Sequence, residues 1–331
     1  MTAANLPSLL QRFFTDRLQS QLGASPHTVA SYRDTFRLLL VFASERLGRA
    51  PSELRVEDFG TVLLGAFLVH LERGRDNTAK TRNTRLAALR SFFRFVAFAE
   101  PACSLQCQQV LAIPTKRHER RPVEFLAENE TAALVAAPDP ATWIGRRDRA
   151  LLLVAVQTGL RNTELRSLRR HDVELGVGAH VRCTGKGRKT RCTPLRRDVA
   201  VALEAWFAER GAAADAPIFP SARGAFLSAD ALQRIVARHV ATASATCSSL
   251  VGRSITPHTL RHTAAMDLLR RGVDLTVIAL WLGHESIETT QIYLHADMRL
   301  KERALGHADP SGVTPTRFRP SDGLLAFLQS L

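Results

Sequence analysis

The sequence predicts a mainly α-helical protein of two domains, with a small antiparallel β-sheet in the second. Apolar residues recur at helical spacing over the first hundred residues and again over most of the chain beyond about residue 126. One stretch, residues 173–193, has instead the residue types of a β-hairpin. With 331 residues, the chain is long enough to form two domains with well-buried cores.

The first hundred residues are predicted to form four helices. The first covers residues 6–22, and the second begins with Ser25 as its N-cap and Pro26 in its first turn. The third is expected over about 56–71 and the fourth over about 78–98. The fourth has an apolar face that packs and an opposite face that is basic. Such a face can simply be solvated, but in a basic chain it favours DNA contact. Its basic residues are Lys80, Arg82, Arg85, Arg90 and Arg94.

The segment from about residue 100 to 122 contains three prolines and a basic run that includes Lys116 and Arg117. It shows no sustained period, and we interpret it as a linker between domains that lies along DNA. The second domain begins near Leu126.

Helices are predicted in the second domain at about 128–136, 145–158, 198–210 and 228–244. The hairpin presents Lys186, Arg188 and Lys189 at its tip. A helix should begin at Thr256-Pro257 and end at Gly272, and the next should run from Asp274 to Gly283. Ser286 is expected to cap a last helix that carries Tyr293.

Composition indicates a polyanionic partner. The formal net charge is +14 and the pI about 10.8, although an arginine-rich composition can raise the charge without any ligand. The five cysteines lack a paired zinc pattern. Cys183 and Cys192 could face each other across the hairpin, but reduced thiols in a cytoplasmic protein are favoured. No signal peptide or membrane-spanning run is evident.

A group of cationic residues and one tyrosine points to a single chemistry. In chain order these residues are Arg161, Lys186, His258, Arg261, His284 and Tyr293. A phenol can attack a phosphodiester if guanidinium groups neutralise the phosphate oxygens and an acid protonates the departing sugar oxygen. Arg161 and Arg261 suit the first task and Lys186 the second. Such a site requires neither a divalent metal nor a cofactor.

Each motif also has a simpler explanation. Arg161 and Glu164 could be a surface helix pair, and Gly185-Lys186-Gly187 could be a plain turn without phosphate-loop spacing. His258 and His262 are spaced as on a zinc helix, but no third ligand is evident. Tyr293 alone would most often be a packing residue. It is the joint occurrence, in this order, that favours the catalytic interpretation.

The chain resembles the tyrosine recombinases of the phage integrase and Xer type over about residues 6–300, with all six catalytic positions matched. Glu164 matches the supporting acidic position. The resemblance implies a helical SAM-like core-binding domain (1–100), a basic linker (101–125), an integrase-type catalytic domain (126–303) and a C-terminal tail (304–331). The tail either docks on another protomer or folds back. The short stretch before the first helix favours a layout without an arm-site domain.

The resemblance implies that Tyr293 forms a 3′-phosphotyrosine on double-stranded DNA. A homotetramer, or a heterotetramer with sister recombinases, would then exchange strands at specific recombination sites. The element moved would be a mobile element, a plasmid or a replicon. Two other functions remain open from the sequence. One is a type IB topoisomerase-like nicking and closing activity, and the other is a non-catalytic DNA-binding regulator with the same fold.

Overall fold

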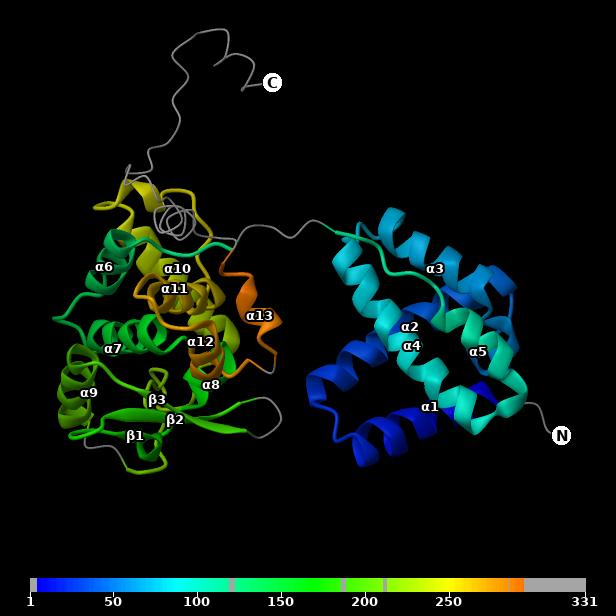
Figure 1. Cartoon of the computed structure of the whole chain (residues 1–331), viewed down its shortest axis with the longest axis horizontal. Helices are drawn as coiled ribbons and strands as arrows, with labels where there is room; N and C mark the ends of the chain where they lie inside the picture. Colours follow the sequence, from blue (N-terminus) through cyan, green and yellow to red (C-terminus); the bar gives the residue numbers. More distant parts are fainter. Residues whose placement is uncertain (1–4, 119–122, 186–188, 211–212, 285, 295–331) are drawn as a thin grey trace, which may run out of the picture. The chain divides into compact units, whose positions relative to one another are not determined.

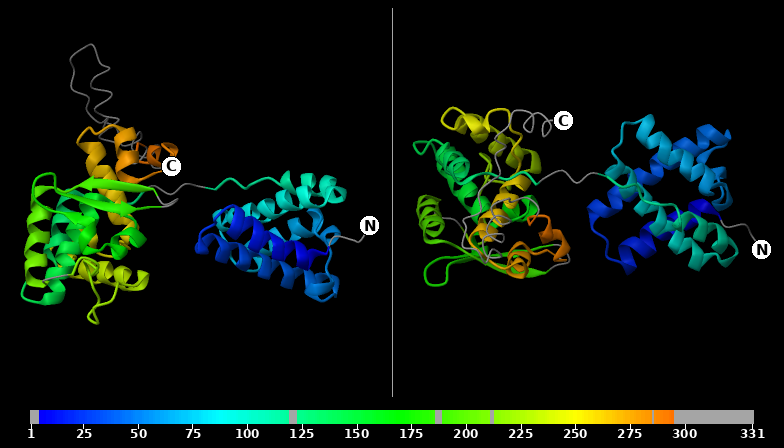
Figure 2. Two further views of the ribbon diagram at one scale, coloured as in Figure 1. Left: turned by 90° about the horizontal axis from the view of Figure 1, so that it is seen from below. Right: turned by 45° about the horizontal axis from the view of Figure 1, so that its top comes forward.

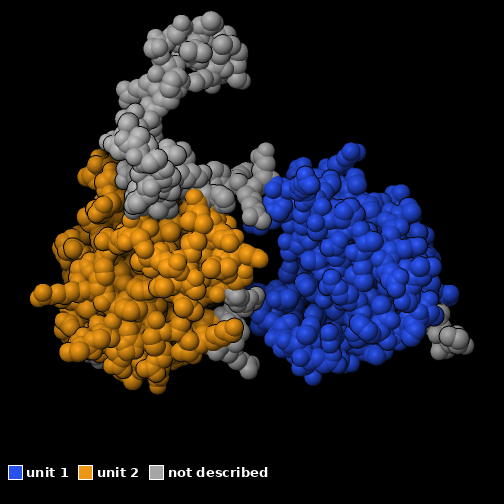
Figure 3. Space-filling view, viewed as in Figure 1, with its two compact units in different colours: residues 1–120 blue, residues 121–331 orange. Residues whose placement is uncertain are grey.

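The computed structural model describes residues 5–118, 123–185, 189–210, 213–284 and 286–294. The chain separates into two compact units, Met1–Arg120 and Arg121–Leu331, shown in blue and orange in Figure 3. Each unit contains its own buried apolar cluster, and each is described by itself below. Within the described residues, no helix combines the length and apolar composition needed to cross a membrane.

The first unit is helical throughout its described part (Figure 1). Its elements are α1 (Leu6–Arg12), η1 (Phe13–Gln21), α2 (Pro26–Leu47), η2 (Pro51–Glu53), η3 (Val56–Asp58), α3 (Thr61–Arg73), α4 (Ala79–Ala99), η4 (Pro101–Cys103) and α5 (Ser104–Leu111). The predicted cap at Ser25 is confirmed, because its side chain accepts from the Thr28 amide, and Thr78 likewise accepts from the Thr81 amide at the start of α4. Such caps typically contribute about 1 kcal/mol each.

Phenylalanines from three helices hold the centre of this unit together. Phe13, Phe36 and Phe92 are all at most 5% exposed. The Phe92 ring centroid lies 5.3 Å from that of Phe13 and 5.1 Å from that of Phe36, both in edge-on geometry. Burying one such side chain contributes about 1.5–3 kcal/mol, so these contacts fix α2 and α4 against η1.

Three sequence predictions for this unit were wrong in detail. The first helix is not α-helical to its end, because η1 is a π-helical stretch. The third helix begins at Thr61 rather than 56, since residues 56–58 form the separate turn η3. The stretch expected to be irregular from residue 100 to 122 contains α5, whose Cys107 and Val110 are fully buried against the apolar cluster. An apolar period this short is difficult to detect in a sequence.

The predicted basic face of α4 divides into two groups. Arg82 is 7% exposed and donates to the Pro114 carbonyl at 3.0 Å, and Arg90 donates to the Ile113 carbonyl. Both therefore hold the segment that follows α5 against α4, so the prediction that Arg82 lies on an open basic face was wrong. Arg85 is half-buried and reaches the Thr35 hydroxyl. Among the residues of this unit predicted to contact DNA, four are exposed: Lys80 and Arg94 of α4, and Lys116 and Arg117 after α5. Lys116 also pairs with Glu72 at 2.8 Å.

The second unit places helices beside a small sheet (Figures 1 and 2). Its helical elements are α6 (Glu128–Ala136), α7 (Trp143–Thr158), α8 (Asn162–Ser167), η5 (Arg170–Asp172), α9 (Arg197–Arg210), α10 (Ala229–Ala243), η7 (Ser248–Leu250), α11 (Pro257–Arg270), α12 (Leu275–Leu282) and α13 (Glu288–Gln291). Helix α7 is central, since eleven of its residues are buried and it contacts α6, α9 and α11.

The sheet has three antiparallel strands in the order β1 (Val173–Glu174), β2 (His180–Thr184) and β3 (Thr190–Pro194). The hairpin is thus confirmed, with an additional short strand before it. In the observed register Cys183 pairs with Arg191 and Cys192 with Arg182, so the two cysteines do not face each other. Both are free thiols, and the disulfide that the sequence allowed does not form.

The last three described helices bring distant parts of the sequence together. Helix α11 is capped by Thr256 and begins at Pro257, and α12 is capped by Asp274 and followed by Gly283 as its C-cap residue, as predicted. The final helix, α13, is shorter than expected: it ends at Gln291, and Tyr293 lies in the turn that follows. Ser286 accepts from the Glu288 amide but lies one residue before the N-cap, Ile287. The predicted docking tail, 304–331, lies outside the described residues.

Candidate active site

The C-terminal end of α12 collects three arginines. Arg191 donates from Nε to the Trp281 carbonyl at 3.1 Å, Arg261 to the Leu282 carbonyl at 2.8 Å, and Arg161 to the Gly283 carbonyl at 2.7 Å. The last carbonyls of a helix have no partner within the helix and bear partial negative charge. Three consecutive carbonyls therefore anchor guanidinium groups that come from three different parts of the chain.

Arg161 is presented by a sharp turn between α7 and α8. Gly159 ends α7 with φ of 62°, and a β-carbon there would lie 2.6 Å from Leu282 Cδ2 and 3.1 Å from Ala264 Cβ. A side chain at this position would therefore be strained by both backbone conformation and contact. Arg161 follows as the N-cap residue of α8, and its side chain remains 32% exposed.

Glu164 lies underneath Arg161 and orients it. The Glu164 side chain is 3% exposed and accepts from the Arg161 guanidinium at 2.9 Å and from its backbone amide at 2.7 Å. Arg191 binds the same carboxylate with two nitrogens, at 3.0 and 2.8 Å. Burial by itself raises the pKa of Glu164, but the hydrogen bonds from Arg191 and Arg161 outweigh it and lower the pKa to about 2. Glu164 is therefore an anion at neutral pH.

Arg261 is the most deeply buried cation of this group. It is 3% exposed, and its two terminal nitrogens donate to the carbonyls of Gly159 and Leu282. Burial, together with the nearby charge of Arg161, lowers the pKa of Arg261 to about 10, so it remains charged at neutral pH. Arg161, His258 and Arg261 line a common pocket of about 350 Å³. Two guanidinium groups at one pocket make a site for an anion.

Tyr293 does not line this pocket but is buried next to the histidines of α11. The residue is 1% exposed, and its hydroxyl lies 3.0 Å from Nδ1 of His262. The His284 ring is stacked on it, with centroids 6.4 Å apart and planes 13° from parallel. Nδ1 of His284 is hydrogen-bonded to the Thr290 hydroxyl at 2.8 Å. Burial raises the pKa of Tyr293 to about 12, although the charge of Arg261 opposes this.

The structure thus brings together Arg161, His258, Arg261, His284 and Tyr293, with Glu164 in support. Lys186, the sixth predicted residue, lies outside the described residues, as does Arg188. Lys189, the residue before β3, is exposed.

Two residues at this site were not predicted from the sequence. Arg191 was missed because its contacts depend on the exact hairpin register, which places it opposite Cys183. His262 was considered only as one of two zinc ligands. Its four-residue spacing from His258 was the available signal, because that spacing places both rings on one face of α11. Their centroids are 4.3 Å apart.

The zinc interpretation of these two histidines finds no support in the described part of the chain. No group of three or more His, Cys, Asp or Glu side chains is arranged there to hold a metal ion. The pocket instead presents guanidinium and imidazole groups, which are suited to an anion.

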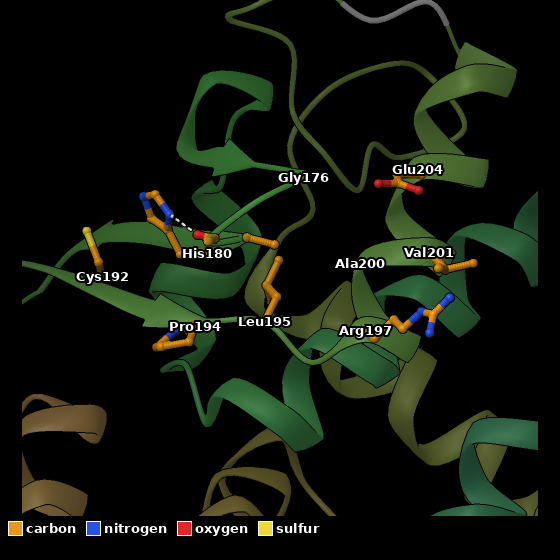
Figure 4. A pocket seen from close by; sticks show the side chains of 11 residues that line it. Gly176, His180, Cys192, Pro194, Leu195, Arg197, Ala200, Val201 and Glu204 are labelled. Atoms are coloured by element: carbon orange, nitrogen blue, oxygen red, sulfur yellow. Dashed lines mark hydrogen bonds between the residues drawn. The ribbon is translucent and has the colours of Figure 1, made fainter.

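A larger pocket of about 880 Å³ lies elsewhere in the second unit (Figure 4). It is formed by the turn before β2, by β3 and by α9. His180 points back to the Gly178 carbonyl at 2.9 Å, whereas Arg197 and Glu204 come from α9. None of the predicted catalytic residues lines this pocket, so pocket size alone does not identify the active site here.

Comparison with known proteins defines the family. Residues 124–299 match the phage integrase family, and residues 10–99 match the phage integrase N-terminal SAM-like domain. A Sinorhizobium fredii protein described as an integrase/recombinase, y4rC, is 53% identical over 328 residues, which cover 99% of both chains. The tyrosine recombinase XerC of Pelobacter propionicus is 33% identical and covers 92% of this chain and 96% of its own. The chain therefore belongs to the phage integrase family of tyrosine recombinases.

Solved structures share the fold. A XerH site-specific recombinase bound to a palindromic difH substrate superimposes with a TM-score of 0.69 at 22% identity, covering 86% of this chain and 80% of that one. The Tn1549 transposon integrase in complex with transposon right-end DNA gives a TM-score of 0.67 at 14% identity, covering 91% and 98%. The predicted fold class, mainly helical with a small antiparallel sheet, is confirmed.

Proposed function

We propose that this chain is a site-specific DNA recombinase that cleaves and rejoins DNA through a 3′-phosphotyrosine on Tyr293. One observation above all supports the assignment of residues: the guanidinium groups of Arg161 and Arg261 line one pocket with His258, and His258 lies against His262, the hydrogen-bond partner of the Tyr293 phenol. The family relationship supports the reaction class. The individual residue roles below are part of the proposal.

Arg161 and Arg261 bind the non-bridging oxygens of the scissile phosphate. Their own carbonyl and carboxylate partners fix both groups before DNA arrives, so little reorganisation is needed when negative charge develops. Glu164 is fully ionised and holds Arg161 in place without competing for the proton of the phenol. His258, at the rim of the pocket, and His284, which follows Gly283, donate to the same phosphate.

The phenol oxygen of Tyr293 attacks phosphorus, and the bond from phosphorus to the 5′-oxygen breaks. Lys186 is the expected acid that protonates the departing oxygen. The free 5′-hydroxyl of a partner strand then attacks the phosphotyrosine and reverses the step at a new junction. Because the phosphodiester energy is conserved in the protein–DNA bond, no nucleotide cofactor is required.

Double-stranded DNA is the partner that this chemistry and the net charge of +14 require. The exposed residues Lys80, Arg94, Lys116 and Arg117 of the first unit are candidates for backbone contacts. Strand exchange needs more than one protomer, and the solved structures of this fold include a lambda integrase tetramer bound to a Holliday junction. We therefore propose a tetramer on two recombination sites, acting in the cytoplasm on a mobile element, plasmid or replicon.

Nicked duplexes tiled across the DNA that flanks the gene would test the proposal. A nick beside the scissile phosphate lets the short product diffuse away, so a covalent protein–DNA adduct accumulates and is seen on a denaturing gel. The expected result is an adduct with the wild type and none with Tyr293→Phe.

Tyr32→Phe is the matched control, because Tyr32 is the other tyrosine of the chain and packs in the first unit. Tight DNA binding without any adduct would indicate a non-catalytic binding protein. Relaxation of supercoiled DNA by isolated protomers, without paired sites, would indicate the topoisomerase-like activity.

A further inference from the structure

His262 contacts the atom that would attack DNA. Its Nδ1 lies 3.0 Å from the Tyr293 hydroxyl, and the two ring centroids are 5.6 Å apart at an angle of 65°. His284 contacts the same phenol by stacking, and its Nδ1 is engaged by Thr290. His258 lies one helical turn before His262, and it lines the phosphate pocket. The three histidines therefore occupy different positions around one phenol.

Both groups of this hydrogen bond are neutral at neutral pH. Burial raises the pKa of Tyr293 to about 12, so the phenol keeps its proton at neutral pH. Burial, then the charges of His258, Arg261 and His284, lower the pKa of His262 to about 4, so its ring is neutral. A neutral imidazole has one nitrogen that accepts. In the tautomer that carries its proton on Nε2, His262 accepts from the phenol at Nδ1, and this is the tautomer that proton transfer requires.

We propose that His262 accepts the phenolic proton of Tyr293 as the phenol attacks DNA, and returns it when the strand is rejoined. The inference rests on the proposed recombinase function. In the forward step the bond from Oη to phosphorus forms, the proton passes to Nδ1, and the bond to the 5′-oxygen breaks with its electron pair. The departing oxygen takes a proton from the expected acid, Lys186, or from water. The reverse step follows the same path backwards.

The surroundings of His262 couple this transfer to substrate. From its own helix, α11, it is faced by His258 and Arg261, and from the segments after α12 and α13 by His284 and Tyr293. In the free protein a proton on His262 would face Arg261 and would be disfavoured. A phosphate in the pocket supplies negative charge that offsets this repulsion, so a proton on His262 is less disfavoured when DNA is bound. Without DNA this negative charge is absent, and the Tyr293 phenol keeps its proton.

The test measures the single-turnover rate of adduct formation on a nicked duplex that the wild type cleaves. All variants carry Tyr32→Phe, so that Tyr293 is the single tyrosine. His262→Asn places an amide oxygen near the position of Nδ1, which can accept a hydrogen bond but not a proton. General-base catalysis contributes about 10²–10⁴-fold, and a loss of that size is expected. His180→Asn, a histidine of the other pocket, is the control and should react at the wild-type rate.

Two rescue measurements separate proton acceptance from other roles. Incorporation of 3-fluorotyrosine makes the phenol more acidic. It should therefore raise the rate of adduct formation by His262→Asn at least tenfold, while changing the rate of the enzyme that retains His262 little. A duplex with a 5′-bridging sulfur has a leaving group that needs no acid. It should not rescue His262→Asn, and rescue by the sulfur would show instead that His262 protonates the leaving group.

Other outcomes would also overturn the inference. His262→Asn and His262→Gln within about threefold of the wild type would show that His262 does not accept the proton. A loss in His262→Asn that fluorotyrosine leaves unchanged would reduce His262 to a positioning residue. Two variants are used because His262 is half-buried and one replacement can fail to fold. If the proposed recombinase function is wrong, the wild type itself forms no adduct. That result differs from a failure of the His262 proposal, in which the wild type forms the adduct and the His262 variants form it at a similar rate.

Discussion

The second unit contains two buried carboxylates, each bound by two arginines, and only one of them belongs to the candidate active site. Glu164 binds Arg161 and Arg191. Asp148 is completely buried and binds Arg147 at 2.7 Å, Arg238 at 2.5 Å and His239 at 2.8 Å. By composition and burial the two clusters are nearly equivalent. Burial raises the pKa of Asp148, but hydrogen bonds from His239 and Arg147 lower it overall, as in Glu164.

The difference lies in what the arginines do with their remaining donors. Arg147 uses its third nitrogen on the Pro220 carbonyl and is buried, and Arg238 is 54% exposed in solvent. Arg161 instead lines a pocket together with Arg261, a buried cation whose two described partners are carbonyls. A buried ion-pair cluster is therefore not evidence of catalysis. A guanidinium that keeps donors free toward a pocket, next to a second cation, is the relevant feature.

Among changes within the two clusters, the largest effect is expected for Arg161→Lys. A lysine ammonium cannot bind Glu164, the Gly283 carbonyl and a phosphate in one plane, so adduct formation should fall about 10²–10³-fold. Arg147→Lys is the matched control in the other cluster. It should lower the urea midpoint of unfolding while leaving the adduct rate per folded molecule unchanged. A near-normal rate for Arg161→Lys would show that Arg161 does not bind the scissile phosphate.

Much of this arrangement could be predicted from the sequence, because its determinants are local. Ser25 caps α2 and Asp274 begins α12 as expected, and Gly283 follows the end of α12 in the left-handed conformation. Capping motifs fix where a helix begins and ends, and so they fix the positions of the side chains near its ends. Arg161, His258, Arg261, His284 and Tyr293 accordingly lie together, while their catalytic roles remain predictions.

What could not be predicted depends on contacts between distant residues. Arg191 reaches Glu164 only because β3 pairs with β2 in one register, and a one-residue slip would turn it to the other face. The contact between His262 and Tyr293 depends on how α13 packs after α12. Helix α5 was missed because its eight residues obtain their stability by packing on α4 rather than from a periodic sequence.

Glu164 should produce a measurable acid sensitivity. Its pKa falls from 4.5 to about 2 on folding, so it stabilises the native state by about 3 kcal/mol above pH 4.5, and this contribution is lost as the pH falls toward 2. Urea unfolding of the wild type and Glu164→Gln should therefore differ at pH 7 and converge near pH 2. Tryptophan fluorescence reports this unit, because Trp143, Trp206 and Trp281 all lie in it.

Asp148→Asn sharpens the same measurement. The pKa of the Asp148 carboxyl is also lowered on folding. Asp148→Asn should therefore be less stable than the wild type at pH 7, and the difference should shrink as the pH falls. Only Glu164→Gln should also slow adduct formation at neutral pH. Equal effects of both variants on the adduct rate would remove the functional distinction between the two clusters.

A smaller loss is expected for Arg191→Lys. The replacement can keep one contact to Glu164, but it cannot bind both carboxylate oxygens and the Trp281 carbonyl together. Arg161 would then be held less firmly, and a misplacement of this kind can cost up to about 10²-fold in rate. The loss should appear in the rate at saturating DNA, with DNA affinity little changed. Arg182→Lys, exposed on the neighbouring strand β2, is the control. A loss of affinity without a loss of rate would assign Arg191 to DNA binding instead.

The smallest effect should come from Arg238→Ala. Although its nitrogen lies 2.5 Å from Asp148, the side chain is 54% exposed, and pairs of this kind contribute about 0–1 kcal/mol. Asp148 also keeps Arg147 and His239 as partners, so no buried charge is left unpaired. Urea unfolding should shift by less than about 1 kcal/mol, and the adduct rate should not change. A loss of several kcal/mol would mean that the outer arginine is essential to the Asp148 cluster. In that case the stability of both clusters would depend on the second arginine. The pocket beside Arg161 would then be the one remaining difference between them.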